Sequence, residues 1–127
     1  MANKKTQDEQ TTLAELKSLL QKFCEDRDWG QFHSPKDLAI GAVTEGSELL
    51  EIFRFMDIEQ QHSILQDPDK RLAIGDELAD VLFFLLRFSQ RFDFDLSQHF
   101  HRKMEKNAIK YPVEDFRGKN HKSSVEV

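Results

Sequence analysis

The chain has 127 residues, with 18 basic and 23 acidic side chains and a net charge of -5 at neutral pH. This length suffices for one domain with a modest core. The acidic balance argues against nucleic acid polymers and anionic membranes as partners, because proteins that bind them usually carry a basic patch. No apolar run reaches the ~18 residues of a membrane span. The chain starts without a signal-peptide pattern and has one cysteine, Cys24, so we expect a cytoplasmic protein without intrachain disulfides.

Hydrophobic periodicity predicts an all-α protein, a helical bundle of four main helices. The expected helices cover residues 12–26, 35–56, 68–92 and 96–111. Three of them begin with a good capping residue, and in two cases a proline follows at the first helical position. Pro112 ends the last helix. Residues 57–65 form either a short helix or a loop.

The predicted domain covers residues 11–115, between a flexible N-terminus over residues 1–10 and a flexible tail over residues 116–127. The third helix contains the segment VLFFLLRF, which is apolar around nearly its whole circumference. A helix that is apolar all round must be buried all round. Four helices of one small chain cannot easily enclose it, so we expect partner subunits and a homo-oligomer.

Two pairs of carboxylates stand on consecutive predicted helices. Glu45 and Glu48 are spaced E-x-x-E, and Glu77 and Asp80 are spaced E-x-x-D, so each pair lies on one helix face. Glu45 and Asp80 also fall within apolar stripes, where an unpaired carboxylate is costly. If the two helices pack antiparallel, the four acids converge, and a divalent cation would relieve their repulsion. All-oxygen ligands suit Mg²⁺ or Mn²⁺. The alternative is two ordinary solvated acidic faces.

Basic and amide side chains share one face of the fourth predicted helix. Lys103, Asn107 and Lys110 follow one another at i, i+4 and i+7. Donors of this kind bind phosphates. The same spacing is also typical of a solvated helix face.

Aromatic residues occur in the polar loop RDWGQFHSP before the second predicted helix. Trp29 could stack on a nucleobase, or it could plug the end of a helical bundle. His33 in the same loop could contact a ligand or only hydrogen-bond the start of the helix.

Several words of this sequence resemble the MazG-like branch of the all-α NTP pyrophosphatases that includes the dCTP pyrophosphatases. The words are EGSE, GDELADVLFFLL, RDWGQFHSPKDL and KMEKNAIKYP, and the resemblance runs from about Leu13 to Tyr111. It implies a helical bundle assembled as a homodimer or homotetramer. It also implies hydrolysis of a nucleoside triphosphate between the α- and β-phosphates, often of surplus or modified deoxynucleotides.

The resemblance also implies roles for individual residues. It assigns Mg²⁺ to Glu45, Glu48, Glu77 and Asp80. Around the nucleotide it places Trp29, His33, Lys103, Asn107, Lys110 and Tyr111. Two further positions near the nucleotide depart from the family pattern, since Phe84 stands where dimeric dCTP pyrophosphatases carry tyrosine and Phe55 where they carry tryptophan. Base and sugar preference therefore stay open.

The predicted mechanism uses one carboxylate to orient or deprotonate water, either Glu48 or Glu45, while pyrophosphate leaves. A carboxylate-bridged di-iron bundle needs two E-x-x-H motifs, and this chain has only Glu59 to His62. The remaining alternative is a non-enzymatic helical oligomeric interaction module. It would explain the apolar third helix but not the acids inside apolar stripes.

Overall fold

The structure is a computed structural model that describes residues 3–127. In this range the chain is all-helical and has no strand, which confirms the predicted fold class. The helices in chain order are α1 (Gln7–Gln10), α2 (Leu13–Asp26), the 3-10 helix η1 (Trp29–Phe32), α3 (Pro35–Phe53), α4 (Ile58–Ile64), α5 (Pro68–Arg91), α6 (Leu96–Lys110) and α7 (Val113–Phe116). None of the helices in the described range is long and apolar enough to cross a membrane.

Side-chain caps explain where the long helices begin. Each cap is a hydroxyl or carboxylate that accepts a hydrogen bond from a backbone N–H of the first turn. The capping residues are Thr12, Ser34, Asp67 and Asp95. Helix α3 ends at Phe53, three residues earlier than the sequence suggested. The segment that could have been helix or loop forms α4, which begins with a capping box at Asp57.

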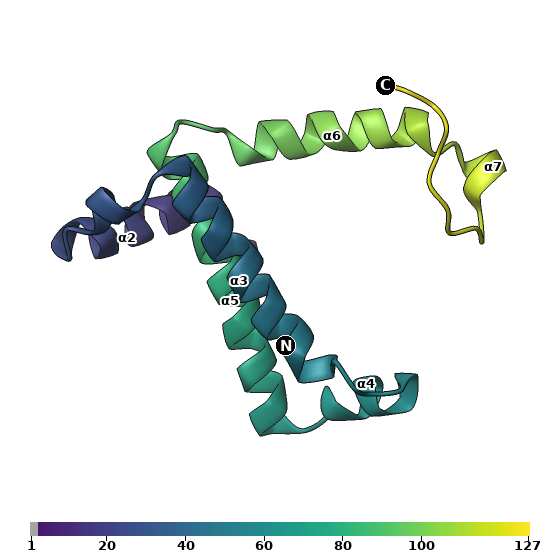
Figure 1. The fold of residues 1–127 in the computed structure, drawn as a ribbon, viewed down its shortest axis with the longest axis horizontal. Coiled ribbons are helices and arrows are strands. Elements are labelled where there is room, and N and C mark those ends of the chain that lie inside the picture. Colours follow the sequence, from purple (N-terminus) through teal and green to yellow (C-terminus); the bar gives the residue numbers. More distant parts are fainter. Residues whose placement is uncertain (1–2) are drawn as a thin grey trace. The chain divides into compact units, whose positions relative to one another are not determined.

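The chain divides into two units, the first ending at Asp93 and the second beginning at Phe94. In the first unit α5 packs against both α3 and α2, and Figure 1 shows α3 and α5 side by side along their length. The residues of its small buried hydrophobic core are Leu20, Cys24, Leu38, Ile74 and Leu86. In the second unit the Phe116 ring packs between the rings of Tyr111 and His121, with both centroid distances 4.9 Å.

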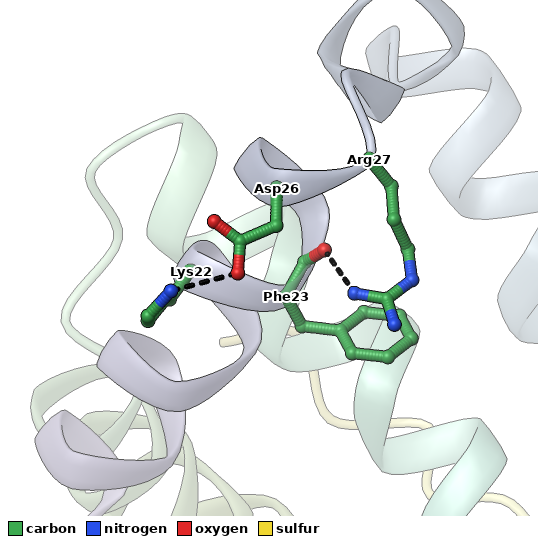
Figure 2. A network of polar contacts seen from close by, with 4 residues as sticks. All are labelled: Lys22, Phe23, Asp26 and Arg27. Atoms are coloured by element: carbon green, nitrogen blue, oxygen red, sulfur yellow. Dashed lines mark hydrogen bonds and ion pairs between the residues drawn. The ribbon is translucent and has the colours of Figure 1, made fainter.

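Polar contacts at the end of α2 hold an aromatic side chain in place. Lys22 and Asp26 form an exposed ion pair of 2.7 Å one helical turn apart (Figure 2). Arg27 Nη1 donates a hydrogen bond of 3.1 Å to the Phe23 carbonyl, which satisfies a carbonyl of the last helical turn. The Arg27 guanidinium also lies 3.7 Å from the centroid of the Phe23 ring. Phe23 is therefore fixed at the point where the chain turns toward η1.

Candidate functional site

Helices α3 and α5 run antiparallel, which is the arrangement that the paired acids require. Glu48 lies near Glu77, whereas Gly41, earlier in α3, lies against Phe84, later in α5. Residue numbers therefore decrease along one helix in the direction in which they increase along the other. The E-x-x-E and E-x-x-D motifs consequently meet along the contact between the two helices.

Three glutamates gather at this contact. Glu45, Glu48 and Glu77 each offer one carboxylate oxygen, and these oxygens lie within 4.8 Å of one another. Glu45 Oε2 and Glu77 Oε2 are buried and have no hydrogen-bond partner. The fourth predicted ligand, Asp80, is exposed and lies outside this trio, although its negative charge acts on Glu45 and Glu77. We call Glu45, Glu48 and Glu77 the acid cluster.

The acid cluster makes its own ionisation unfavourable. The pKa of Glu45 is raised chiefly by the neighbouring Glu48 carboxyl group, then by burial and by the charges of Asp80 and Glu77. The pKa of Glu77 is raised chiefly by burial and then by the charges of Glu48 and Asp80. A divalent cation would satisfy the two partnerless oxygens and offset this repulsion. The donor set is all oxygen, so the residues fit a hard cation.

A row of aromatic rings leads from the tryptophan loop to the helix pair. Neighbouring ring centroids are 5.4 Å apart for Trp29 and Phe23, 6.2 Å for Phe23 and Phe83, and 5.3 Å for Phe83 and Phe84, all edge-on. The last ring lies directly on Gly41, where a Cβ would come within 2.3 Å of it. Since Gly41 is one helical turn before the acid cluster, the row connects the loop with the acids.

His33 directly follows η1, and its side chain makes a buried hydrogen bond that the sequence did not suggest. Its side chain is 8% exposed, and its Nδ1 accepts a hydrogen bond of 2.9 Å from Arg87 Nε. Arg87 Nη1 donates to Gln90 Oε1 at 2.6 Å. The pKa of His33 is lowered by burial and by the charges of Arg87 and Arg91. An arginine inside the apolar segment VLFFLLRF was the available signal for this pairing.

Phe55 and four residues of the second unit complete the set of predicted ligand-binding residues. Phe55 is 85% exposed beyond the end of α3, with the Arg54 guanidinium 4.8 Å from its ring centroid. Four predicted residues belong to the second unit, so their contact with phosphates or sugar stays a prediction. They are Lys103, Asn107, Lys110 and Tyr111.

The sequence matches a family model across the helices that form this site. The model describes the MazG-like family and matches residues 40–124. The chain belongs to the MazG-like family. This match includes the whole acid cluster, and it confirms the resemblance seen in the sequence.

Curated relatives of this MazG-like chain are named dCTP pyrophosphatase 1. The dCTP pyrophosphatase 1 of Bos taurus is 36% identical over 107 residues, which are 84% of this chain and 63% of that protein. The Homo sapiens protein of the same name is 34% identical over 102 residues, or 80% of this chain and 60% of that protein. The chain thus spans less than two thirds of the length of these relatives.

A solved structure shares the fold of this chain. The crystal structure of a pyrophosphatase from Archaeoglobus fulgidus aligns with a TM-score of 0.73 and 32% sequence identity. The alignment covers 88% of this chain and 98% of that one.

Proposed function

We propose that this chain is a Mg²⁺-dependent nucleoside triphosphate pyrophosphohydrolase that converts a (d)NTP and water into a (d)NMP and pyrophosphate. The observation that carries the proposal is the acid cluster, in which two buried carboxylate oxygens lack any partner. Glu45, Glu48 and Glu77 would hold the metal, with Asp80 as a fourth ligand from the same face of α5. Mn²⁺ is a possible substitute. The names of the relatives support the reaction class.

The three glutamates differ in exposure, which separates their roles. Glu45 and Glu77 are partly buried, whereas Glu48 is exposed and so is accessible to a water molecule. We assign Glu48 to orient and deprotonate the attacking water, with Glu45 as the second candidate. The water oxygen adds to the α-phosphorus, and the bond from that phosphorus to the β-phosphate oxygen breaks. When bound, Mg²⁺ neutralises phosphate oxygens and stabilises the developing charge.

The aromatic row supplies the proposed nucleobase subsite. Trp29 is 37% exposed, which leaves part of its ring available for stacking. His33 lies beside it, with ring centroids 6.4 Å apart. Phe84 lies between this loop and the acid cluster, near the expected place of the sugar. The named relatives favour dCTP or a modified nucleotide as substrate, and removal of such nucleotides as the role.

The remaining predicted contacts complete this proposal. Phe55 would reach the nucleotide from the end of α3. Lys103, Asn107, Lys110 and Tyr111 are the residues proposed to bind the phosphates or the sugar. Positively charged and amide donors at helical spacing are suited to phosphate oxygens.

The proposed enzyme is a homodimer or homotetramer. Apolar side chains on α3 and α5 are widely exposed in the single chain, which is unfavourable in water. They are Ile40 (51%), Val43 (74%), Leu50 (63%), Leu78 (54%) and Leu85 (48%). Light scattering at micromolar concentration should show a dimer or tetramer, and a fully active monomer would contradict this. A cytoplasmic location is also proposed, since Cys24 is a free buried thiol.

The decisive experiment measures pyrophosphate release from a panel of canonical and modified dNTPs, with and without Mg²⁺. We expect Mg²⁺-dependent turnover that Glu77→Gln abolishes. Asp76→Asn is the matched control, because it removes one negative charge from an exposed neighbouring position on α5. It should retain turnover. Absence of activity in the wild-type protein would favour the helical interaction module, for which the exposed apolar side chains are the supporting observation.

A further inference from the structure

The hydrogen bond between Arg87 and His33 determines which ring nitrogen of the histidine carries the proton. Arginine stays protonated in proteins, so Arg87 Nε is always a donor. The nitrogen 2.9 Å away, His33 Nδ1, must therefore accept. A neutral histidine whose Nδ1 accepts carries its hydrogen on Nε2. The tautomer of His33 is thus set by a residue of α5.

The surroundings also keep this ring neutral. His33 is 8% exposed and Arg87 is 2% exposed, so a second positive charge here would be poorly solvated. Arg87 and Arg91 on α5 repel an imidazolium, and only Asp37 on α3 attracts it. On α2 the nearby titratable group is the buried thiol of Cys24. Protonation at Nδ1 would in addition break the bond to Arg87 Nε.

The other ring nitrogen is available to a ligand. Within residues 3–127, His33 Nε2 has no hydrogen-bond partner and is not one of the buried partnerless atoms, so it is reached by solvent. The ring stands at 68° to that of Trp29, with centroids 6.4 Å apart. A nucleobase stacked on the tryptophan would bring its polar edge toward this N–H.

We propose that Arg87 is a positioning residue that holds His33 as a permanent hydrogen-bond donor, so that the subsite takes an acceptor atom of a nucleobase, a carbonyl oxygen or an unprotonated ring nitrogen. The inference rests on the proposed function and states how the base subsite distinguishes one nucleobase from another. A base that presents an N–H at this point is rejected, because two donors would face each other once the base shields them from water. Arg87 contacts no substrate and acts through His33.

The first test needs no substrate. In the ligand-free protein labelled with ¹⁵N-histidine, NMR distinguishes protonated from unprotonated ring nitrogens, and His33→Gln identifies the His33 signals. We expect a protonated Nε2, an unprotonated Nδ1 and a titration displaced below the ordinary histidine pKa of 6.5. A protonated Nδ1, or titration near the ordinary pKa of 6.5, would refute the proposal.

The second test measures KM and kcat for dCTP against pH in Arg87→Met. With its partner gone, His33 exchanges tautomers and protonates, so we expect KM to rise and its pH dependence to change while kcat stays nearly constant. The expected change is up to about tenfold, the contribution of one hydrogen bond. Arg87→Lys retains the charge and a donor, so it should restore part of the wild-type profile.

Arg91→Met is the matched control, because it removes a neighbouring positive charge but no hydrogen bond to His33. It should keep the wild-type tautomer. If Arg87→Met leaves both the tautomer and the KM profile unchanged, Arg87 has no positioning role. If Arg87→Met fails to fold, the NMR tautomer of the wild-type protein and the Arg87→Lys profile decide. Absence of nucleotide hydrolysis by the wild-type protein would instead refute the proposed function.

Discussion

Two glycines of α3 offer a matched test of how closely α3 and α5 pack. Gly41 lies against the ring of Phe84, whereas a Cβ added at Gly46 would meet nothing within 4 Å. Both positions are helical and neither has a positive φ. Alanine at either position therefore brings the same gain in helix propensity. The two substitutions differ in whether the added methyl group has space.

The expected effects follow from the distances. Alanine in place of a helical glycine stabilises by about 1 kcal/mol, and Gly46→Ala should retain this gain. At Gly41 the new Cβ would be 2.3 Å from Phe84 Cε1, whereas ordinary contact begins at 3.4 Å, so the ring must recede by about 1.1 Å. Overpacking costs about 1–3 kcal/mol. The net loss for Gly41→Ala is about 0–2 kcal/mol, and the two variants should differ by about 1–3 kcal/mol.

Urea unfolding of both variants, at one protein concentration and without metal, measures this difference. Mg²⁺ titration should also show weaker binding for Gly41→Ala, because a displaced Phe84 pushes α5 and its Glu77 away from α3. In a Phe84→Leu background the penalty at Gly41 should shrink, which a double-mutant cycle detects. Equal stabilisation by Gly41→Ala and Gly46→Ala would refute the close contact between Gly41 and the Phe84 ring.

Three further perturbations test the site. Because the pKa of Glu77 is raised, the metal-free folded state binds its proton more tightly than the unfolded chain. Its contribution to stability is complete below the ordinary pKa of 4.5 and is lost as pH rises through the raised value. Glu77→Gln should remove this pH-dependent loss in urea unfolding, and an unchanged profile would contradict the repulsion argument. The pKa of His33 is lowered, so its contribution is complete above 6.5 and declines as pH falls below it. Thermal unfolding of the wild type and of His33→Gln, compared at pH values above and below 6.5, measures this loss of stability. The same pH dependence of stability in both proteins would contradict it. Trp29→Ala should lower kcat/KM by about one to two decades for all bases, since stacking contributes about 1–3 kcal/mol. A wild-type kcat/KM for Trp29→Ala in steady-state kinetics would show that the nucleobase does not stack on Trp29.

The sequence by itself determined the features that depend on near neighbours in the chain. Ser34 followed by Pro35, and Asp67 followed by Pro68, predict helix starts because the cap and the first turn are within three residues of each other. The pairing of Glu45 with Glu48 on one helix face follows from helical spacing alone. The class of fold and the carboxylate motif were therefore predictable.

Only the tertiary structure decided which distant residues meet. Glu77 joins Glu45 and Glu48, whereas Asp80, three residues later, is left outside the trio, because the register of α5 against α3 is set by packing along the whole pair. One contact of that packing is the Phe84 ring on Gly41, which no local pattern indicates. The bond from Arg87 to His33 joins residues 54 positions apart. Its cause is that a buried guanidinium must find an acceptor, and the fold determines which one lies within reach.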